Sequence, residues 1–156
     1  MNNLYSNKFN LKFSLPERPG TSLPEIPNDL EDMSDRTLMS LYTEVVAWVN
    51  YSKAELSKAE ISEEGSLAAL KHIETVVLLQ YGDTNKSERV TMAKARRDVH
   101  PEVMDKRGTY QQSRAYRKLV STVFDRGERN TSVLSRELSR RISVAPNERR
   151  TQWTNA

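Results

Sequence analysis

Apolar residues recur along residues 38–80 at alternating steps of four and three, which is the spacing of a coiled-coil seam. Nine of the thirteen seam positions are apolar or alanine. The positions are Leu38, Tyr42, Val45, Val49, Ser52, Leu56, Ala59, Glu63, Ser66, Leu70, Ile73, Val77 and Gln80. Ser34 is a favourable N-cap and Gly82 a favourable residue just past a helix end. We therefore predict one helix over residues 34–81, with a kink or a diverging partner near the polar positions Glu63 and Ser66.

Two further helices are predicted after turn-forming residues at 82–85. Ser87 can cap a short helix that ends near Asp98, because Pro101 pushes His100 out of the helical conformation. Pro101 suits the first position of a third helix, predicted over residues 101–143. The apolar stripe of this helix consists of Val103, Tyr110, Tyr116, Leu119, Val120, Val123, Phe124, Val133, Leu134, Leu138 and Ile142.

The predicted fold class is all-α: a long antiparallel, coiled-coil-like helical hairpin with a short hinged helix between its arms and flexible termini. A highly charged chain of 156 residues with few aromatic residues has little material for a core, so we expect the hairpin to be oligomeric. The residues predicted to form the oligomer interface are Leu38, Tyr42, Val45, Trp48, Val49, Leu56, Leu70, Ile73 and Val77.

Both ends of the chain lack the helical pattern. Residues 1–33 contain four of the six prolines, and we expect an extended or disordered arm. Residues 7–13 have apolar side chains at every second position, so this part of the arm could instead add as a strand or lie as a strap across a neighbour. Residues 144–156, beyond the predicted third helix, read as a C-terminal tail, in which Trp153 is either incidental or a docking anchor.

The sequence carries no pattern typical of an enzyme, and no cofactor or metal is expected. His72 and His100 are the only histidines and lie on different predicted elements, and the GDTNKS segment lacks the second glycine of a phosphate-binding loop. There is no cysteine, no apolar run of signal-peptide length and no stretch long enough to span a membrane. We therefore expect a cytoplasmic protein that does not contact a membrane.

The two halves of the chain carry opposite charge. Residues 1–81 hold 7 Lys and Arg against 12 Asp and Glu, a net of −5, whereas residues 82–156 hold 17 against 9, a net of +8. Such an asymmetry indicates an anionic partner for the second half, most commonly nucleic acid. An alternative stays open, in which the arginines pair with acidic residues of the first long helix, such as Glu63 and Glu74.

Many of the basic residues of the third helix recur at helical spacing, so they form a stripe that could follow a phosphate backbone. Tyr110 and Tyr116 could give bases a surface for stacking. The residues predicted to bind nucleic acid are Lys71, Lys94, Arg96, Arg97, Lys106, Arg107, Tyr110, Arg114, Arg117 and Lys118.

The layout is similar to that of the small helical accessory proteins of tailed phages. The order and length of its elements resemble those of the UvsY-type recombination mediators. The segments that carry this resemblance are LYTEVVAWVNYSKAEL, ALKHIETVVLLQYGD, KARRDVHPEV and YQQSRAYRKLVSTVFDRGERNTSVLSREL. The resemblance covers residues 38–143 and implies a ring-forming protein that binds single-stranded DNA and helps to load a recombinase. It also implies a DNA contact at Lys71, although Ile73 stands where that family has a second cation.

These observations predict a non-enzymatic, oligomeric accessory protein of phage recombination or replication that binds single-stranded DNA in the cytoplasm of an infected bacterium. Its expected partners are single-stranded DNA, further copies of itself and a recombinase or other replication protein. Two alternatives stay open: a phage-encoded helical module that binds or inhibits a host protein, or a structural component of the virion whose N-terminal arm straps neighbouring subunits.

Overall fold

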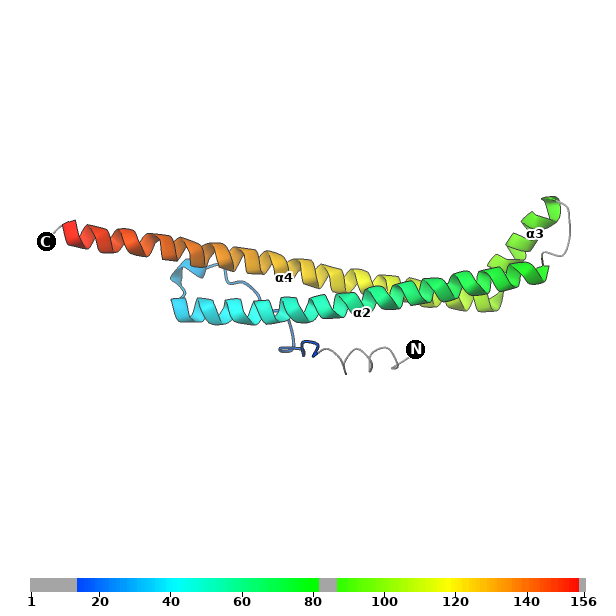
Figure 1. Cartoon of the computed structure of the whole chain (residues 1–156), viewed down its shortest axis with the longest axis horizontal. Helices are drawn as coiled ribbons and strands as arrows, with labels where there is room; N and C mark the ends of the chain where they lie inside the picture. Colours follow the sequence, from blue (N-terminus) through cyan, green and yellow to red (C-terminus); the bar gives the residue numbers. More distant parts are fainter. Residues whose placement is uncertain (1–13, 82–86, 155–156) are drawn as a thin grey trace. The chain divides into compact units, whose positions relative to one another are not determined.

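The computed structural model describes residues 14–81 and 87–154 and is all-α (Figure 1). A short 3₁₀ helix, η1 (Leu30–Asp32), precedes three α-helices: α2 (Asp35–Tyr81), α3 (Ser87–Asp98) and α4 (Pro101–Thr154). The long helices α2 and α4 pack antiparallel with the short α3 between them in the chain. The predicted helical hairpin is therefore confirmed.

Three of the predicted helix boundaries are confirmed, together with their causes. The Thr37 amide donates to Ser34 Oγ at 3.2 Å and the Leu38 amide donates to the Ser34 carbonyl at 2.9 Å, so Ser34 caps α2. The interruption between α3 and α4 falls at residues 99–100, directly before Pro101. Gly82 lies outside the described residues.

α2 runs without interruption from Asp35 to Tyr81, through the polar positions near Glu63 and Ser66, and a kink or a diverging partner there stays a prediction. Two of the polar seam residues, Ser52 and Ser66, are buried. They donate to the carbonyls of Val49 and Glu63 at 3.0 and 2.8 Å, so these polar seam residues satisfy their own hydrogen bonds inside the helix.

The predicted end of the third helix at residue 143 is wrong, because α4 continues to Thr154 through Pro146. A proline within a helix lacks the amide hydrogen for one backbone hydrogen bond, and its ring crowds the preceding turn. The good helix formers Glu148, Arg149 and Arg150 follow Pro146 after Asn147 and favour continuation of the helix. The supposed tail up to Thr154 is therefore helical, and the side chain of Trp153 lies outside the described set.

The chain divides into two compact units. Within the described residues, unit 1 contains residues 14–54 and 122–154, and unit 2 contains residues 55–121. Leu38, Val45 and Leu134 form the buried core of unit 1. Leu70 and Val77 of α2 and Val103 of α4 form the buried core of unit 2, with Ile73 and Tyr110 packed against it. Each unit thus joins one part of α2 to one part of α4.

The predicted seam is the buried face of α2. Of the nine residues predicted for the oligomer interface, six are buried and the other three, Tyr42, Val49 and Ile73, are partly buried. Because this burial occurs within a single chain, the seam needs no second copy to be covered. Oligomerisation stays a prediction.

Residues 14–33, which we call the strap, belong to unit 1 and lie along its two helices (Figure 1). Apart from η1 they form no regular structure, yet Ile26 and Leu30 pack against the core of unit 1. The apolar side chains of this part of the arm therefore have partners on the two helices of unit 1. The apolar positions at residues 9, 11 and 13 lie outside the described residues.

Candidate nucleic-acid interface

Two of the three arginines of α4 that were predicted to bind nucleic acid, Arg107 and Arg117, pair with acidic residues of their own unit. In unit 2, Arg107 Nη2 lies 3.1 Å from Glu74 Oε1 and 3.2 Å from Asp98 Oδ1. Arg117 Nε donates to the carboxylate of Glu63, which is itself largely buried. These cations hold α4 against α2, and the alternative of pairing within the chain is confirmed for Arg107 and Arg117.

The ion pairs of Arg107 with Glu74 and Asp98, which we call the Arg107 cluster, also shift pKa values. Hydrogen bonds from Arg97, and then from Arg107, lower the pKa of the Asp98 carboxyl, and a hydrogen bond to Glu74 followed by one to Asp98 raises the pKa of the Arg107 guanidinium. Arg97 Nη2 lies 2.8 Å from Asp98 Oδ1. The cluster therefore joins the end of α3 to both long helices within unit 2.

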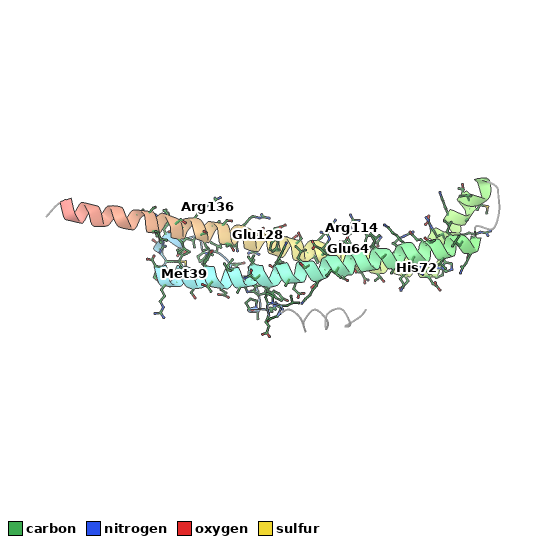
Figure 2. The ribbon with its side chains drawn as sticks, viewed as in Figure 1. Met39, Glu64, His72, Arg114, Glu128 and Arg136 are labelled. Carbon is green, nitrogen blue, oxygen red and sulfur yellow. The ribbon has the colours of Figure 1, made fainter. Side chains whose placement is uncertain are left out.

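Acidic side chains also accompany the exposed part of the basic stripe. Glu60, Glu63 and Glu64 line one hollow with Leu67 and Arg117. Arg114 is exposed, and it lies close to the level of Glu64 along unit 2 (Figure 2). Lys118 is exposed as well but interacts within the chain. Positive and negative side chains therefore alternate on this face, which makes it a weaker binding surface for a phosphate backbone than the sequence alone indicates.

The two tyrosines proposed for base stacking differ in exposure. Tyr110 packs against the core of unit 2 and is partly buried, so its ring supports the fold. Tyr116 is 52% exposed. Tyr116 lies two residues from Arg114 and from Lys118, which places it on a different side of α4 from these cations.

A different cluster forms where α2 ends and α3 runs past it. The guanidinium carbon of Arg96 lies over the Tyr81 ring, 5.8 Å from its centroid, and the His100 ring meets Tyr81 edge-on at 6.4 Å. Tyr81 is 39% exposed, and both Arg96 and Lys94 are exposed. Neither cation has an ion pair among the described residues. We call Tyr81, Lys94 and Arg96 the elbow cluster.

Sequence reasoning found the two cations of the elbow cluster but missed Tyr81. Tyr81 is the last residue of α2 and stands outside the heptad frame, so no spacing within one helix could link it to Arg96. The contact depends on how α3 folds back after residues 82–86. The remaining predicted residues are Lys71, which is exposed on α2, and Lys106, whose ammonium lies 3.5 Å from its neighbour Asp105.

In unit 1, Arg141 of α4 binds the strap. Arg141 donates from Nη2 to the Leu30 carbonyl and from Nη1 to the Met33 carbonyl, both at 2.6 Å, and from Nη1 to Asp35 at 2.7 Å. Glu137 orients this guanidinium by accepting from Arg141 Nε at 2.8 Å. Hydrogen bonds from Arg140 and then from Arg141 lower the pKa of Glu137 to about 2.

No group of three or more histidine, aspartate or glutamate side chains in the described ranges could hold a metal ion. None of the helices in the same ranges is both long and apolar enough to cross a membrane. Comparison with family models, curated proteins and solved structures gave no significant match. The resemblance to the UvsY-type mediators therefore remains a prediction that depends on the order and length of elements.

Proposed function

We propose that this chain is a non-enzymatic accessory protein of phage recombination or replication that self-associates and binds single-stranded DNA, with the elbow cluster as its main contact. The observation that carries the proposal is the position of exposed Arg96 over Tyr81, next to exposed Lys94. A cation stacked on an aromatic ring beside a second cation offers both a phosphate contact and a surface for a base.

The elbow cluster differs from the α4 stripe in the cost of engaging DNA. Arg107 and Arg117 would have to leave carboxylates that are 25% and 16% exposed, and those carboxylates would then be left without their partners. Among the residues whose side chains the structure describes, none forms an ion pair with Lys94 or Arg96. The positive charge that is available to an anionic polymer is therefore greater at α3 than on the inner face of α4.

Binding through this cluster should be electrostatic and weakly dependent on sequence. Each phosphate contact by lysine or arginine releases counterions, so affinity falls as salt rises. The base contact adds stacking, which every base can provide. Single strands are favoured over duplexes, because a duplex keeps its bases stacked and out of reach of Arg96.

A gel-shift series over a range of salt concentrations tests the proposal with the variant that carries Lys94→Gln and Arg96→Gln. For a single strand, the loss of two phosphate contacts should reduce the slope of log affinity against log salt by about 1.4. The matched control carries Arg107→Gln and Arg117→Gln and removes the same charge. It should lower the melting temperature and leave the slope of log affinity against log salt nearly unchanged. No binding of single strands by the unchanged protein at low salt would overturn the proposal.

A second candidate function is docking of a protein. Met92 is 56% exposed and lies four residues before Arg96, on the same face of α3, and Val99, directly after this helix, is 70% exposed. Exposed methionine is common on surfaces that bind other proteins. If the chain fails to bind single strands while Met92→Ser abolishes its association with a replication protein, this second function is the better one.

A further inference from the structure

Two exposed arginines of α4 in unit 1 take no part in the contacts described so far. Arg129 and Arg136 lie seven residues apart, which is about two turns of the helix. The ion pairs of α4 within unit 1 are made by Arg126, Arg140 and Arg141. Within the described ranges, no carboxylate therefore pairs with Arg129 or Arg136.

Both arginines lie on the side of α4 that is turned away from α2. Arg136 comes two residues after Leu134, which is buried in the core of unit 1. Arg129 comes two residues after Gly127, where a Cβ would lie 2.9 Å from Val49 of α2. Because a step of two residues turns an α-helix by about 200°, both guanidinium groups point away from this packed side. An anion can therefore reach them without separating the two helices.

A serine hydroxyl lies between the two arginines. Ser132 is exposed, shares the same side of α4 and lines one hollow together with both arginines. The hydroxyls of Thr131, Ser139 and Ser143 donate to main-chain carbonyls of α4. The hydroxyl of Ser132 has no such hydrogen bond in the part of the chain that the structure describes, so it can donate to an oxygen of a ligand.

The acidic residues of this face lie at its N-terminal end, where Asp125 and Glu128 line the hollow. From residue 129 to residue 144 the chain holds 4 arginines against 1 glutamate, a net of +3. That glutamate, Glu137, is largely buried and accepts hydrogen bonds from Arg140 and Arg141. The exposed charge of α4 between residues 129 and 144 is therefore positive, which suits an anionic ligand.

The chemistry of this face fits phosphate and not a base. A guanidinium group matches the geometry of a phosphate with two parallel hydrogen bonds, and a serine hydroxyl is a common donor to phosphate oxygens. Residues 129–144 contain no phenylalanine, tyrosine or tryptophan, so this stretch offers no ring on which a base can stack. Cations two turns apart along a helix match the repeated charges of a polymer better than one phosphate group.

We propose that Arg129, Ser132 and Arg136 form a second nucleic-acid site, which holds the phosphodiester backbone and does not contact the bases. We call these three residues the phosphate face. Phosphates are exposed in single strands and in duplexes alike, so the phosphate face binds both, whereas the ring of Tyr81 makes the elbow cluster favour single strands. The inference rests on the nucleic-acid binding in the proposed function and adds a site that does not distinguish the two kinds of strand.

A gel-shift series over a range of salt concentrations, with a single strand and a duplex of the same length, tests the phosphate face in the full chain. The variant carries Arg129→Gln and Arg136→Gln. The loss of two phosphate contacts should reduce the slope of log affinity against log salt by about 1.4 for the single strand and by about 1.8 for the duplex. Arg129→Lys with Arg136→Lys keeps the charge and should restore most of both slopes.

The matched control carries Arg36→Gln and Lys58→Gln, which remove the same charge from exposed positions of α2. Both slopes should stay nearly unchanged in this control. The melting temperatures of the control and of the Arg129→Gln, Arg136→Gln variant should stay close to that of the unchanged protein, because exposed charges contribute little to stability.

The outcomes separate this inference from the proposed function. Unchanged slopes in the Arg129→Gln, Arg136→Gln variant would overturn the phosphate face alone and leave this side of α4 to an acidic protein surface. Equal losses in the variant and its control, a loss for the single strand alone, or no binding of the duplex by the unchanged protein would also overturn it. Slopes that fall here but not in the variant of Lys94 and Arg96 contradict the elbow cluster and support the phosphate face. No binding of either strand at low salt contradicts both.

Discussion

Arg141 donates from Nη2 to the main-chain carbonyl of Leu30 at 2.6 Å, across 111 residues of sequence. The same side chain reaches the Met33 carbonyl and Asp35, and Glu137 holds it in place. Only 17% of the Arg141 side chain is exposed. One planar guanidinium with five donors therefore fixes the end of the strap to both long helices of unit 1.

Replacing Arg141 with lysine should loosen the strap, because a single ammonium cannot serve carbonyls and carboxylates in different directions at once. We expect faster hydrogen exchange of the Met33 amide and a red shift of Trp48 fluorescence in a Trp153→Phe background. Arg140→Lys is the matched control, since Arg140 pairs with Glu137 but does not contact the strap carbonyls. Equal effects of the two substitutions would contradict the role of Arg141.

Two glycines of α4 should respond to alanine in opposite directions. A Cβ at Gly127 would lie 2.9 Å from Val49 Cγ2, whereas a Cβ at Gly108 would have no atom within 4 Å. Gly127→Ala should therefore destabilise the protein by about 1–3 kcal/mol through overpacking. Gly108→Ala should stabilise it by up to about 1 kcal/mol, because alanine favours the helix. Urea unfolding of both variants measures the difference, and a stabilised Gly127→Ala would contradict the close approach of α2 and α4.

Acid should weaken unit 1 through Glu137. The pKa of this carboxyl is lowered from 4.5 to about 2 by hydrogen bonds from Arg140 and Arg141. A carboxyl whose pKa is lowered by folding stabilises the folded state at pH values above its pKa in the unfolded chain. The contribution of Glu137 is therefore complete above about pH 5 and is lost as pH falls through 4.5 towards 2. The difference in urea midpoint between the unchanged protein and Glu137→Gln should shrink over this range. A constant difference would show that Glu137 does not carry the effect.

A charge in the seam should unfold unit 1 as well as affect any oligomer. Val45 is fully buried against Leu38 and Leu134, so Val45→Asp should cost about 3 kcal/mol or more by burying an unpaired carboxylate. Met39→Asp is the control, because Met39 is about half exposed on the same helix and the cost there should stay within about 0.5 kcal/mol. Circular dichroism melts measure both. A Val45→Asp variant with unchanged stability would exclude the seam as the core.

The local chemistry of the sequence was sufficient to predict the three helices. Ser34 and the His100–Pro101 step set boundaries through interactions within a few residues, and the heptad spacing identified the buried face of α2. The end of α4 was beyond this reasoning, because the local penalty at Pro146 does not determine whether a long helix continues.

The site was less predictable than the fold. A basic stripe looks the same in a sequence whether it faces phosphate or carboxylate, and only the register of α2 against α4 brings Arg117 to Glu63 and Arg107 to Glu74. The contact between Arg96 and Tyr81 depends in the same way on the path between two helices. The polar contacts of the strap depend on Asn130 and Arg141, more than a hundred residues away, which no local pattern can indicate.

The distance in sequence between the strap and its anchors also sets an order of events during synthesis. The strap is made before Asn130 and Arg141, the α4 residues that hold its carbonyls. Leu30 and Arg141 are 111 residues apart, so translation at roughly 5–20 residues per second leaves the strap without these partners for roughly 6–20 s. During that time the apolar side chains of the strap are exposed on the nascent chain.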